Sequence, residues 1–205
     1  MKQFLFALII ITTLNNCTPK KASYENEIKL FQYELNIQFA DAEETPLKEE
    51  DLKTFKKLDF FKIDKNYRLE ATLEETPNSP VFEMPTTTDR LPLYRKYGIA
   101  HFTINDEKFE LSVYQNQKLM TDFEYENYLF IPFNDTTNGN QSYGGGRYID
   151  VEIPSKGSTT LIIDFNKSYN PYCAYNDKYS CPIPPSENNL TIAIPVGVKL
   201  YSKHH

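Results

Sequence analysis

The chain has 205 residues, of which 40% are hydrophobic and 14% aromatic, with 15 Tyr and 14 Phe but no Trp. This length suits one domain with a substantial core, and the aromatic content favours a β-rich globular fold over a disordered chain. The formal net charge of −6 and the scatter of the basic residues argue against a polyanion-binding surface, so nucleic acid is not expected as a partner.

The N-terminal residues have the layout of a secretory signal. Lys2 precedes the apolar run Phe4–Ile11, which is too short for a transmembrane helix of about 20 residues. The sequence Leu14-Asn15-Asn16-Cys17 resembles the lipobox of bacterial lipoproteins, in which the cysteine becomes the lipidated first residue. Acyl chains on Cys17 would anchor the protein to a membrane of the bacterial cell envelope, with its domain facing the periplasm or the exterior. The expected segments are a signal peptide (1–16), a lipidated Cys with its tether (17–23) and a single β-rich domain (24–205).

A helix is predicted at the start of this domain. Four apolar side chains recur at three- and four-residue steps within Glu25–Phe39, which places them on one stripe that can dock against the body. Thr45 and Pro46 then have the pattern of an N-cap followed by a proline in the first helical position, and a short second helix is expected to run to about Lys57. The acidic residues Glu49–Asp51 are interpreted as its solvated first turn rather than as a metal site. The stripe of the first helix consists of Ile28, Phe31, Leu35 and Phe39.

Beyond Phe61 the apolar pattern changes to the period of a strand. From Tyr67 to Glu74, apolar and polar side chains alternate, which predicts a strand with one solvated face. Turn residues at Pro77–Pro80 and Asn105–Lys108 separate apolar runs and predict two hairpins. The expected strands are Tyr67–Glu74, Val81–Thr88, Ile99–Ile104, Phe109–Val113, Asn127–Phe133, Tyr148–Ile153, Thr159–Phe165 and Leu190–Val196.

Short strands with tight links and no helices between them favour an antiparallel arrangement over a parallel sheet. The predicted fold class is α+β, mainly antiparallel β. We expect a sandwich or a partly closed barrel of about eight strands, with one or two N-terminal helices covering one end or face. No repeat of fixed period and no low-complexity linker follows Ser23, so one domain is expected.

The clearest candidate for a binding site is the run Gly144–Gly146, which is followed directly by Arg147. Its three glycines permit positive φ and close approach of a ligand, and consecutive amides can bind an anion. Arg147 has the fork geometry to bind a carboxylate or phosphate of a ligand, or an internal acid, for which Asp150, Asp164 and Glu187 are the candidates. A flexible turn and an internal salt bridge are the structural alternatives. The run lacks the Lys-Ser/Thr pair of a nucleotide-binding loop and does not open a helix, so nucleotide binding is rejected.

Polar side chains near the ends of neighbouring strands extend this candidate site. Asp135 lies in a turn after a strand, and Asp164 ends an apolar strand. An acid at a sheet rim can act as a general base or anchor a ligand, although such side chains more often satisfy loop amides. The catalytic candidates are Asp164, Glu187 and Arg147. The predicted ligand-binding residues are Gly144, Gly145, Gly146, Arg147, Tyr148, Asp135, Asn166, Tyr169 and Asn170.

Cys173 and Cys181 are predicted to form a disulfide, because the chain is expected to be exported and only seven residues separate the two. Closing so short a loop would stabilise the fold by roughly 2–3 kcal/mol. Two buried free thiols or one reactive cysteine are the alternatives, and no nearby histidine supports a cysteine nucleophile. His101 lies in a strand and the remaining two histidines are terminal, so neither a metal site nor a cofactor is expected.

Several long segments resemble a known family. They read MPTTTD, FNDTTNGNQSYGGGRYIDVE, LIIDFNKSYNPYCAYNDKYSCPIPPSENNL and IPVGVK. They stand in the same order as in the bacterial and archaeal family catalogued as domain of unknown function 1684, and the resemblance covers roughly Glu25 to Lys199. Because that family has no assigned activity, the resemblance implies no catalytic role and marks only the positions of the candidate residues.

Three functions are compatible with these patterns. The chain is interpreted first as an uncharacterised lipid-anchored envelope protein that binds a small anionic molecule through Arg147 and the glycine amides, or that serves as a structural module. The alternative is a hydrolase or lyase in which Asp164 or Glu187 acts as the base and Arg147 with the glycine loop forms an oxyanion site. No nucleophile is evident, so binding and structural roles rank above catalysis. The expected partners are the membrane, through the lipid on Cys17, and an anionic small molecule.

Overall fold

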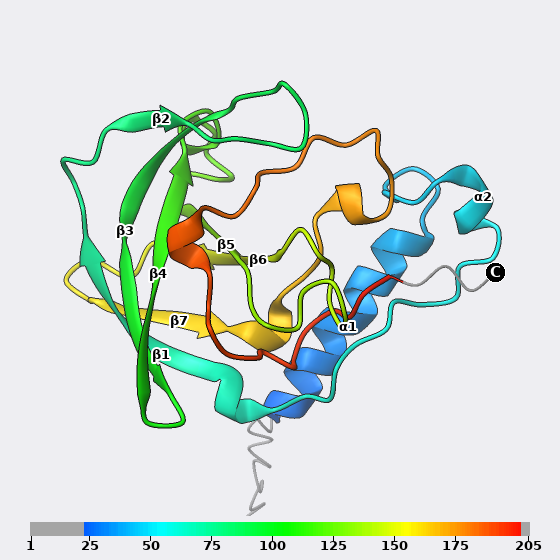
Figure 1. Ribbon diagram of the computed structural model, residues 1–205, viewed down its shortest axis with the longest axis horizontal. Coiled ribbons are helices and arrows are strands. Elements are labelled where there is room, and N and C mark those ends of the chain that lie inside the picture. The colour runs from blue at the N-terminus through cyan, green and yellow to red at the C-terminus, as the bar shows by residue number, and fades with distance from the viewer. Residues whose placement is uncertain (1–22, 202–205) are drawn as a thin grey trace, which may run out of the picture.

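The computed structural model describes residues 23–201, and its strands form one antiparallel sheet that curls into a half-barrel (Figure 1). The strand order is β6-β5-β4-β3-β1-β7, and the short strand β2 pairs with β3 off this path. The two outer strands, β6 and β7, approach each other across the open side. The strands are β1 (Arg68–Glu75), β2 (Val81–Glu83), β3 (Leu93–Ile104), β4 (Glu107–Asn116), β5 (Tyr128–Phe133), β6 (Arg147–Glu152) and β7 (Thr160–Asp164).

The inner face of the sheet carries the main hydrophobic core. Alternate side chains of the strands point into it, among them Leu129, Ile131 and Ile149, which are at most 2% exposed. Each such side chain contributes about 1.5–3 kcal/mol relative to its exposed state. The C-terminal segment covers this core with Leu190, Ile194 and Val196.

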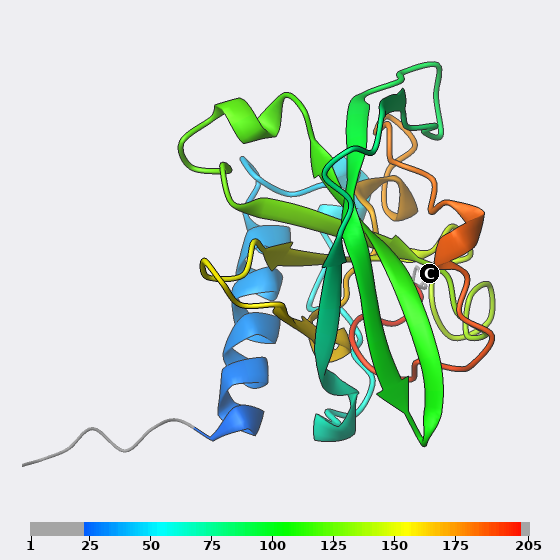
Figure 2. The same cartoon turned by 90° about the vertical axis from the view of Figure 1, so that its left-hand side faces the viewer.

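Helix α1 (Tyr24–Ala40) lies beside β6 and β7 at one end of the sheet (Figures 1 and 2). The predicted helix is therefore confirmed. Its stripe packs tightly only at the two ends, where Ile28 and Phe39 are buried. Between them, Phe31 and Leu35 line a cavity, so the helix forms a wall of that cavity as well as part of the core.

The hairpin predicted between the third and fourth expected strands is confirmed. Asn105 and Asp106 both have positive φ, at 50° and 66°, which suits the two-residue turn that connects twisted antiparallel strands. The first predicted hairpin is wrong, because β2 pairs with the start of β3 through Val81 and Arg95. Both edges of β1 are already occupied, one by β3 and one by β7.

The strand count and the sandwich also need correction. The described chain has seven strands in one curled sheet instead of about eight in a sandwich or barrel. The expected strand at Leu190–Val196 is absent, because the carbonyls of Ile194 and Val196 accept hydrogen bonds from an arginine side chain and Pro195 has no amide to donate. The second helix is much shorter than expected, since α2 spans only Glu49–Leu52.

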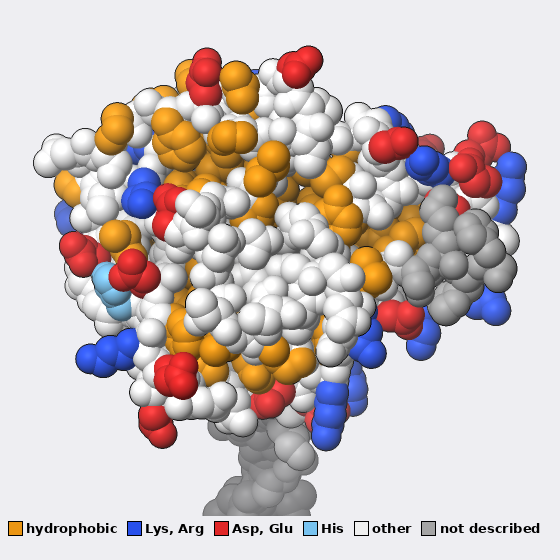
Figure 3. All heavy atoms as spheres, in the orientation of Figure 1, with side chains coloured by type: hydrophobic (Ala, Val, Ile, Leu, Met, Phe, Trp, Pro, Cys, Tyr) orange, Lys and Arg blue, Asp and Glu red, His pale blue; other side chains and the backbone are white. Residues whose placement is uncertain are grey.

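The expected signal peptide and the lipidated Cys17 lie outside the described residues. Between residues 23 and 201, no helix is both long enough and apolar enough to cross a membrane. On the face shown in Figure 3, basic side chains are scattered around the edge and do not form a stripe.

Candidate functional site

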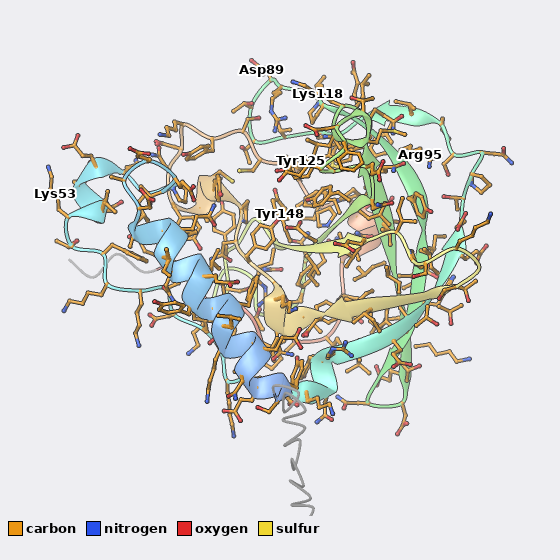
Figure 4. The ribbon with its side chains drawn as sticks, turned by 180° about the vertical axis from the view of Figure 1, so that it is seen from behind. Lys53, Asp89, Arg95, Lys118, Tyr125 and Tyr148 are labelled. Carbon is orange, nitrogen blue, oxygen red and sulfur yellow. The ribbon has the colours of Figure 1, made fainter. Side chains whose placement is uncertain are left out.

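A cavity of about 490 Å³ lies between α1, the outer face of β5 and β6, and the loop that runs from residue 169 to residue 182. Aromatic side chains dominate its walls. Figure 4 shows one of them, Tyr148, in the region between α1 and the sheet. We call this cavity the tyrosine pocket, because it is lined by Tyr94, Tyr128, Tyr148, Tyr169, Tyr172, Tyr175 and Tyr179.

Asp150 carries the only charge among the described residues that line the tyrosine pocket. Its Oδ1 accepts hydrogen bonds from the hydroxyls of Tyr128 and Tyr169, each at 2.7 Å. Its Oδ2 accepts none from the described part of the chain. The carboxylate is therefore held in place by one oxygen while the other remains available.

The surroundings of Asp150 explain its electrostatics. Burial raises the pKa of this carboxyl, and the hydrogen bonds from the two tyrosines oppose that rise. Burial also raises the pKa of Tyr128 and Tyr169, so both hydroxyls remain protonated donors. The side chain still keeps solvent contact, which is the situation of a carboxylate on the wall of an open pocket.

Tyr148 is fixed in this wall by several contacts. Its backbone exchanges two hydrogen bonds with Tyr169, at 2.9 and 3.0 Å, which protects the edge of β6. Its hydroxyl donates to the carbonyl of Pro182. Its ring meets that of Phe130 edge-on, with 4.7 Å between centroids and 74° between planes. This part of the pocket is preformed by the fold.

Asn170 adds a second polar group to the pocket lining. Its Nδ2 donates to the carbonyl of Lys199 at 2.8 Å, which fixes the orientation of the amide. Its Oδ1 is buried and has no hydrogen-bond partner in the described chain. A buried acceptor without a donor costs about 1–3 kcal/mol, so this atom is a local cost to the stability of the fold.

Arg147, the centre of the predicted binding site, is fully buried inside the fold instead of lining the pocket. Its Nη2 donates to Asp135 Oδ2 at 2.6 Å and to the Ile194 carbonyl at 2.7 Å, and its Nη1 donates to the Val196 carbonyl at 2.5 Å. The side chains of Arg147 and Asp135 have no solvent exposure. We call this arrangement of Arg147, Asp135 and the two carbonyls the arginine clasp.

The arginine clasp connects β6 to the C-terminal segment. Burial lowers the pKa of Arg147, and the nearby Asp135 carboxylate opposes that shift. The guanidinium also lies over the rings of Phe61 and Phe133, at 5.7 and 5.3 Å from their centroids. Asp135 Oδ1 accepts from the Thr137 amide at 2.8 Å, so the carboxylate is engaged through both oxygens. The internal salt bridge, the structural alternative for this arginine, is the one observed, but its partner is Asp135 and not Asp150, Asp164 or Glu187.

The glycine run forms a turn beside the clasp. Gly144 and Gly145 are exposed, whereas Gly146 is buried with a φ of 89°. The Gly146 amide donates to the Tyr143 carbonyl at 3.2 Å, so it does not point into an anion-binding concavity. A Cβ at Gly146 would lie 2.6 Å from Pro184 Cγ, which explains why this position requires glycine.

Asp164 and Asn166 hold neighbouring segments together. Asp164 accepts hydrogen bonds from the Tyr24 hydroxyl at 2.9 and 3.0 Å and from the Asn166 amide at 3.1 Å. Asn166 accepts from the Asp64 amide at 2.9 Å and donates to the Asp64 carbonyl at 2.8 Å, as a neighbouring strand would. Both side chains therefore satisfy loop and helix groups.

Glu187, the other carboxylate proposed as a base, accepts from the Tyr114 hydroxyl at 2.9 Å and lies 3.3 Å from the Lys96 ammonium. Neither Glu187 nor Asp164 lines the tyrosine pocket or the second cavity, which lies beside the N-terminal half of α1. Arg147 lines neither cavity. The hydrolase arrangement, in which a carboxylate and Arg147 share one open pocket, is not present in these residues.

The predicted disulfide is wrong, since Cys173 and Cys181 are both free thiols. The Cys173 amide donates to the Cys181 sulfur at 3.1 Å, so the two residues remain in contact. The Cys181 thiol hydrogen-bonds Cys173 and lowers the pKa of the Cys173 thiol to about 7, with a smaller contribution from Tyr143. Among residues 23–201, no group of three or more His, Cys, Asp or Glu side chains is placed to hold a metal ion.

The structure divides the predicted ligand-binding residues into two groups. Tyr148, Tyr169 and Asn170 line the tyrosine pocket. The others belong to the arginine clasp, the glycine turn or the Asp164 cluster, and they are Asp135, Gly144, Gly145, Gly146, Arg147 and Asn166.

Asp150 and Tyr128 were missed as pocket residues. For Asp150 the signal was present, because residues two apart on a strand share a face and Tyr148 was already a candidate.

A family model described as "Protein of unknown function (DUF1684)" matches residues 53–199 of the chain. The chain belongs to this family. The match confirms the resemblance drawn from the sequence, and it begins after α1, so one wall of the tyrosine pocket lies outside the matched region.

One solved protein structure is similar to this chain over most of its length. The solution NMR structure of an uncharacterized protein from gene locus rrnAC0354 of Haloarcula marismortui is 31% identical, with a TM-score of 0.67. The similarity covers 86% of this chain and 94% of that one. No curated protein matches the chain. These relatives establish family and fold, and they carry no activity to compare.

Proposed function

We propose that this protein is a lipid-anchored envelope protein that binds one small organic molecule in the tyrosine pocket. The observation that carries the proposal is the pocket itself. Its volume of about 490 Å³ falls in the usual range for small-molecule sites, roughly 300–1,000 Å³. Its aromatic walls with a few placed polar groups, Asp150 and Asn170 among them, have the composition of such sites.

Preorganisation favours binding at this position. The Asp150 carboxylate and the Tyr148 ring are both held by hydrogen bonds within the fold, so a ligand does not have to order them. Binding needs no nucleophile, and the residues considered for catalysis, Arg147, Asp164 and Glu187, lie elsewhere.

The proposed location rests on the N-terminal sequence. A basic residue, a short apolar run and a lipobox-like sequence ending at Cys17 favour export and lipidation. Labelling of cells with a fatty-acid probe should mark the wild-type protein, and Cys17→Ser should remove the label. Equal labelling of the variant would contradict the anchor.

A matched pair of tryptophan substitutions on α1 tests the pocket. Leu35 lines the pocket, so Leu35→Trp should fill it, whereas Ile37 is 51% exposed on the same helix and Ile37→Trp should leave it open. A fragment library containing cationic, neutral and anionic compounds is screened by ligand-observed NMR against both variants and the wild type. Hits that bind the wild type and Ile37→Trp but not Leu35→Trp support the proposal. A screen without hits, or hits that persist in Leu35→Trp, would refute it.

A further inference from the structure

The lining of the tyrosine pocket carries a negative charge and no positive charge among the described residues. Asp150 contributes a carboxylate, and no lysine or arginine is present among the lining residues that the structure describes. Arg90 does not line the pocket but bonds a residue that does: it is exposed and donates to the Ser180 carbonyl at 2.6 Å and to the Ser180 hydroxyl at 3.0 Å. Asp150 is exposed as well, so salt screens both groups, but only Asp150 lines the pocket. The chain as a whole carries a formal charge of −6, which also favours the approach of cations.

Asp150 has a carboxylate oxygen that the described chain leaves open, whereas the hydroxyls of Tyr172 and Tyr175 accept from Gln38 and Asn170 and can still donate. Asp150 Oδ1 is occupied by two tyrosine hydroxyls, whereas its Oδ2 accepts no hydrogen bond from the described chain. Both tyrosine hydroxyls that face Asp150 are used as donors to it. A ligand that brings N–H groups would satisfy Asp150 Oδ2, while a ligand that brings only acceptors would not.

The aromatic walls add a second preference for positive charge. The negative faces of aromatic rings attract cations within about 6 Å of their centroids. The pocket combines seven tyrosines with an acid, and Tyr148 and Tyr169 are locked at 90° to each other with 5.9 Å between ring centroids. Perpendicular rings of this kind form a corner that can enclose an apolar group with a cationic end.

We infer that the ligand of the tyrosine pocket is a small organic ammonium ion, whose N–H groups meet Asp150 Oδ2 and whose apolar part lies among the tyrosine rings. This inference rests on the proposed function and narrows it to one chemical class. The expected ligand is therefore a cation and not the anion predicted from the sequence. Arg147, the residue that favoured an anion, is fully buried and bonded to Asp135.

Three probes of the same shape and different charge test the inference. They are 2-phenylethylammonium, 2-phenylethanol and 3-phenylpropionate, and each is titrated into the purified full-length chain while Kd is measured by protein-observed NMR. The ammonium should bind about ten- to one-hundred-fold more tightly than the alcohol, since hydrogen bonds to a charged group are stronger than neutral ones. The carboxylate should bind weakest of the three.

Two charge-neutralising variants on β6 identify the carboxylate. Asp150→Asn keeps an oxygen that can accept from the tyrosines, so it should retain the fold and lose about tenfold or more in ammonium affinity. Glu152→Gln removes the same charge from the same strand, outside the pocket lining, and should leave the affinity unchanged. Thermal unfolding of both variants checks that neither has lost its structure.

The outcomes separate the ligand class from the pocket. Tight ammonium binding that is lost in Asp150→Asn and in Leu35→Trp supports the inference. Equal or tighter binding of the alcohol or the carboxylate overturns the ammonium class, and if that binding is lost in Leu35→Trp the proposed pocket stands. Ammonium binding that survives Asp150→Asn overturns the role of the carboxylate. Binding of any probe that survives Leu35→Trp overturns the proposed site itself.

Discussion

Replacing Arg147 with Met should destabilise the protein by about 3–5 kcal/mol, because the substitution leaves the buried Asp135 carboxylate without its partner. The Val196 carbonyl loses its donor as well, and the Ile194 carbonyl keeps only the Val196 amide, which places the expected loss toward the upper end. For a domain of this size each kcal/mol lowers Tm by about 2–4 °C, so Tm should fall by about 6–20 °C.

Equilibrium urea unfolding followed by circular dichroism measures this loss. The control is Arg68→Met, because Arg68 Nε lies 3.9 Å from Asp164 and the arginine side chain is 36% exposed. This pair is worth at most about 1 kcal/mol, because Arg68 is partly exposed and the buried Asp164 carboxylate keeps its donors Tyr24 and Asn166 without it. The contrast between the two arginine variants separates loss of the clasp from loss of an ordinary ion pair.

A double-mutant cycle isolates the ion pair within the clasp. Asp135→Asn removes the charge but keeps an acceptor for the Thr137 amide. The double variant with Arg147→Met should therefore be less destabilised than the sum of the two single variants, with a coupling of about 1–3 kcal/mol. An Arg147→Met variant within about 1 kcal/mol of the wild type, or a coupling near zero, would refute the reasoning.

Three further predictions follow from local geometry. Gly146→Ala should cost about 1–3 kcal/mol more than Gly157→Ala in urea unfolding, because both glycines have positive φ but only at 146 would a Cβ meet other atoms, as close as 2.6 Å; equal losses would contradict this. The alkylation rate of Cys173 by iodoacetamide should rise with pH around a midpoint near 7, where its pKa lies, and Cys181→Ala should move that midpoint upward; a midpoint that does not move would show that Cys181 is not the cause. Asn188→Ala should lose at least about 3 kcal/mol, because this buried amide bonds three backbone groups of β4 and β5; urea unfolding measures the loss, and a change below about 1 kcal/mol would contradict it.

The alternation of apolar and polar residues was enough to locate most of the sheet. The predicted strand Tyr67–Glu74 corresponds to β1, and Tyr148–Ile153 corresponds to β6, each shifted by one residue. Alternation reports the local conformation and which face is buried, but it does not report which strand lies alongside. The pairing of β2 with β3 depends on which edges are free after β1 has bound β3 and β7, and that is a property of the assembled sheet.

The sequence also overestimated the strand content at the C-terminus for a definite reason. Leu190–Val196 has apolar residues with the composition of a strand, and these side chains are buried as a strand's would be. Two of its backbone acceptors, the carbonyls of Ile194 and Val196, are taken by Arg147, a side chain more than forty positions earlier in the chain. A local pattern cannot indicate that an arginine will take the place of a neighbouring strand.

The candidate site was less predictable than the fold. The composition of Gly144–Arg147 is typical of an anion-binding site, yet Arg147 is buried and binds Asp135 and two backbone carbonyls. The tyrosine pocket has no comparable local motif, because its walls come from four distant parts of the chain: α1, Tyr94 at the start of β3, the strands β5 and β6, and the loop after residue 168. Tyrosines are spread over the sequence, and only the curl of the sheet and the position of α1 bring seven of them together.

The arginine clasp and the tyrosine pocket use opposite faces of the same strand, β6. On β6, Arg147 and Ile149 point to the inner core, while Tyr148 and Asp150 point outward into the tyrosine pocket. β6 is also an outer strand of the sheet, with β5 as its ladder partner on one side and a single backbone bridge to Tyr169 on the other. An outer strand frays more readily than a central one, so a pocket built on it needs an independent anchor. The arginine clasp provides that anchor at the first residue of the strand, directly beside the first pocket residue, and this makes a buried arginine useful to a site that it does not touch.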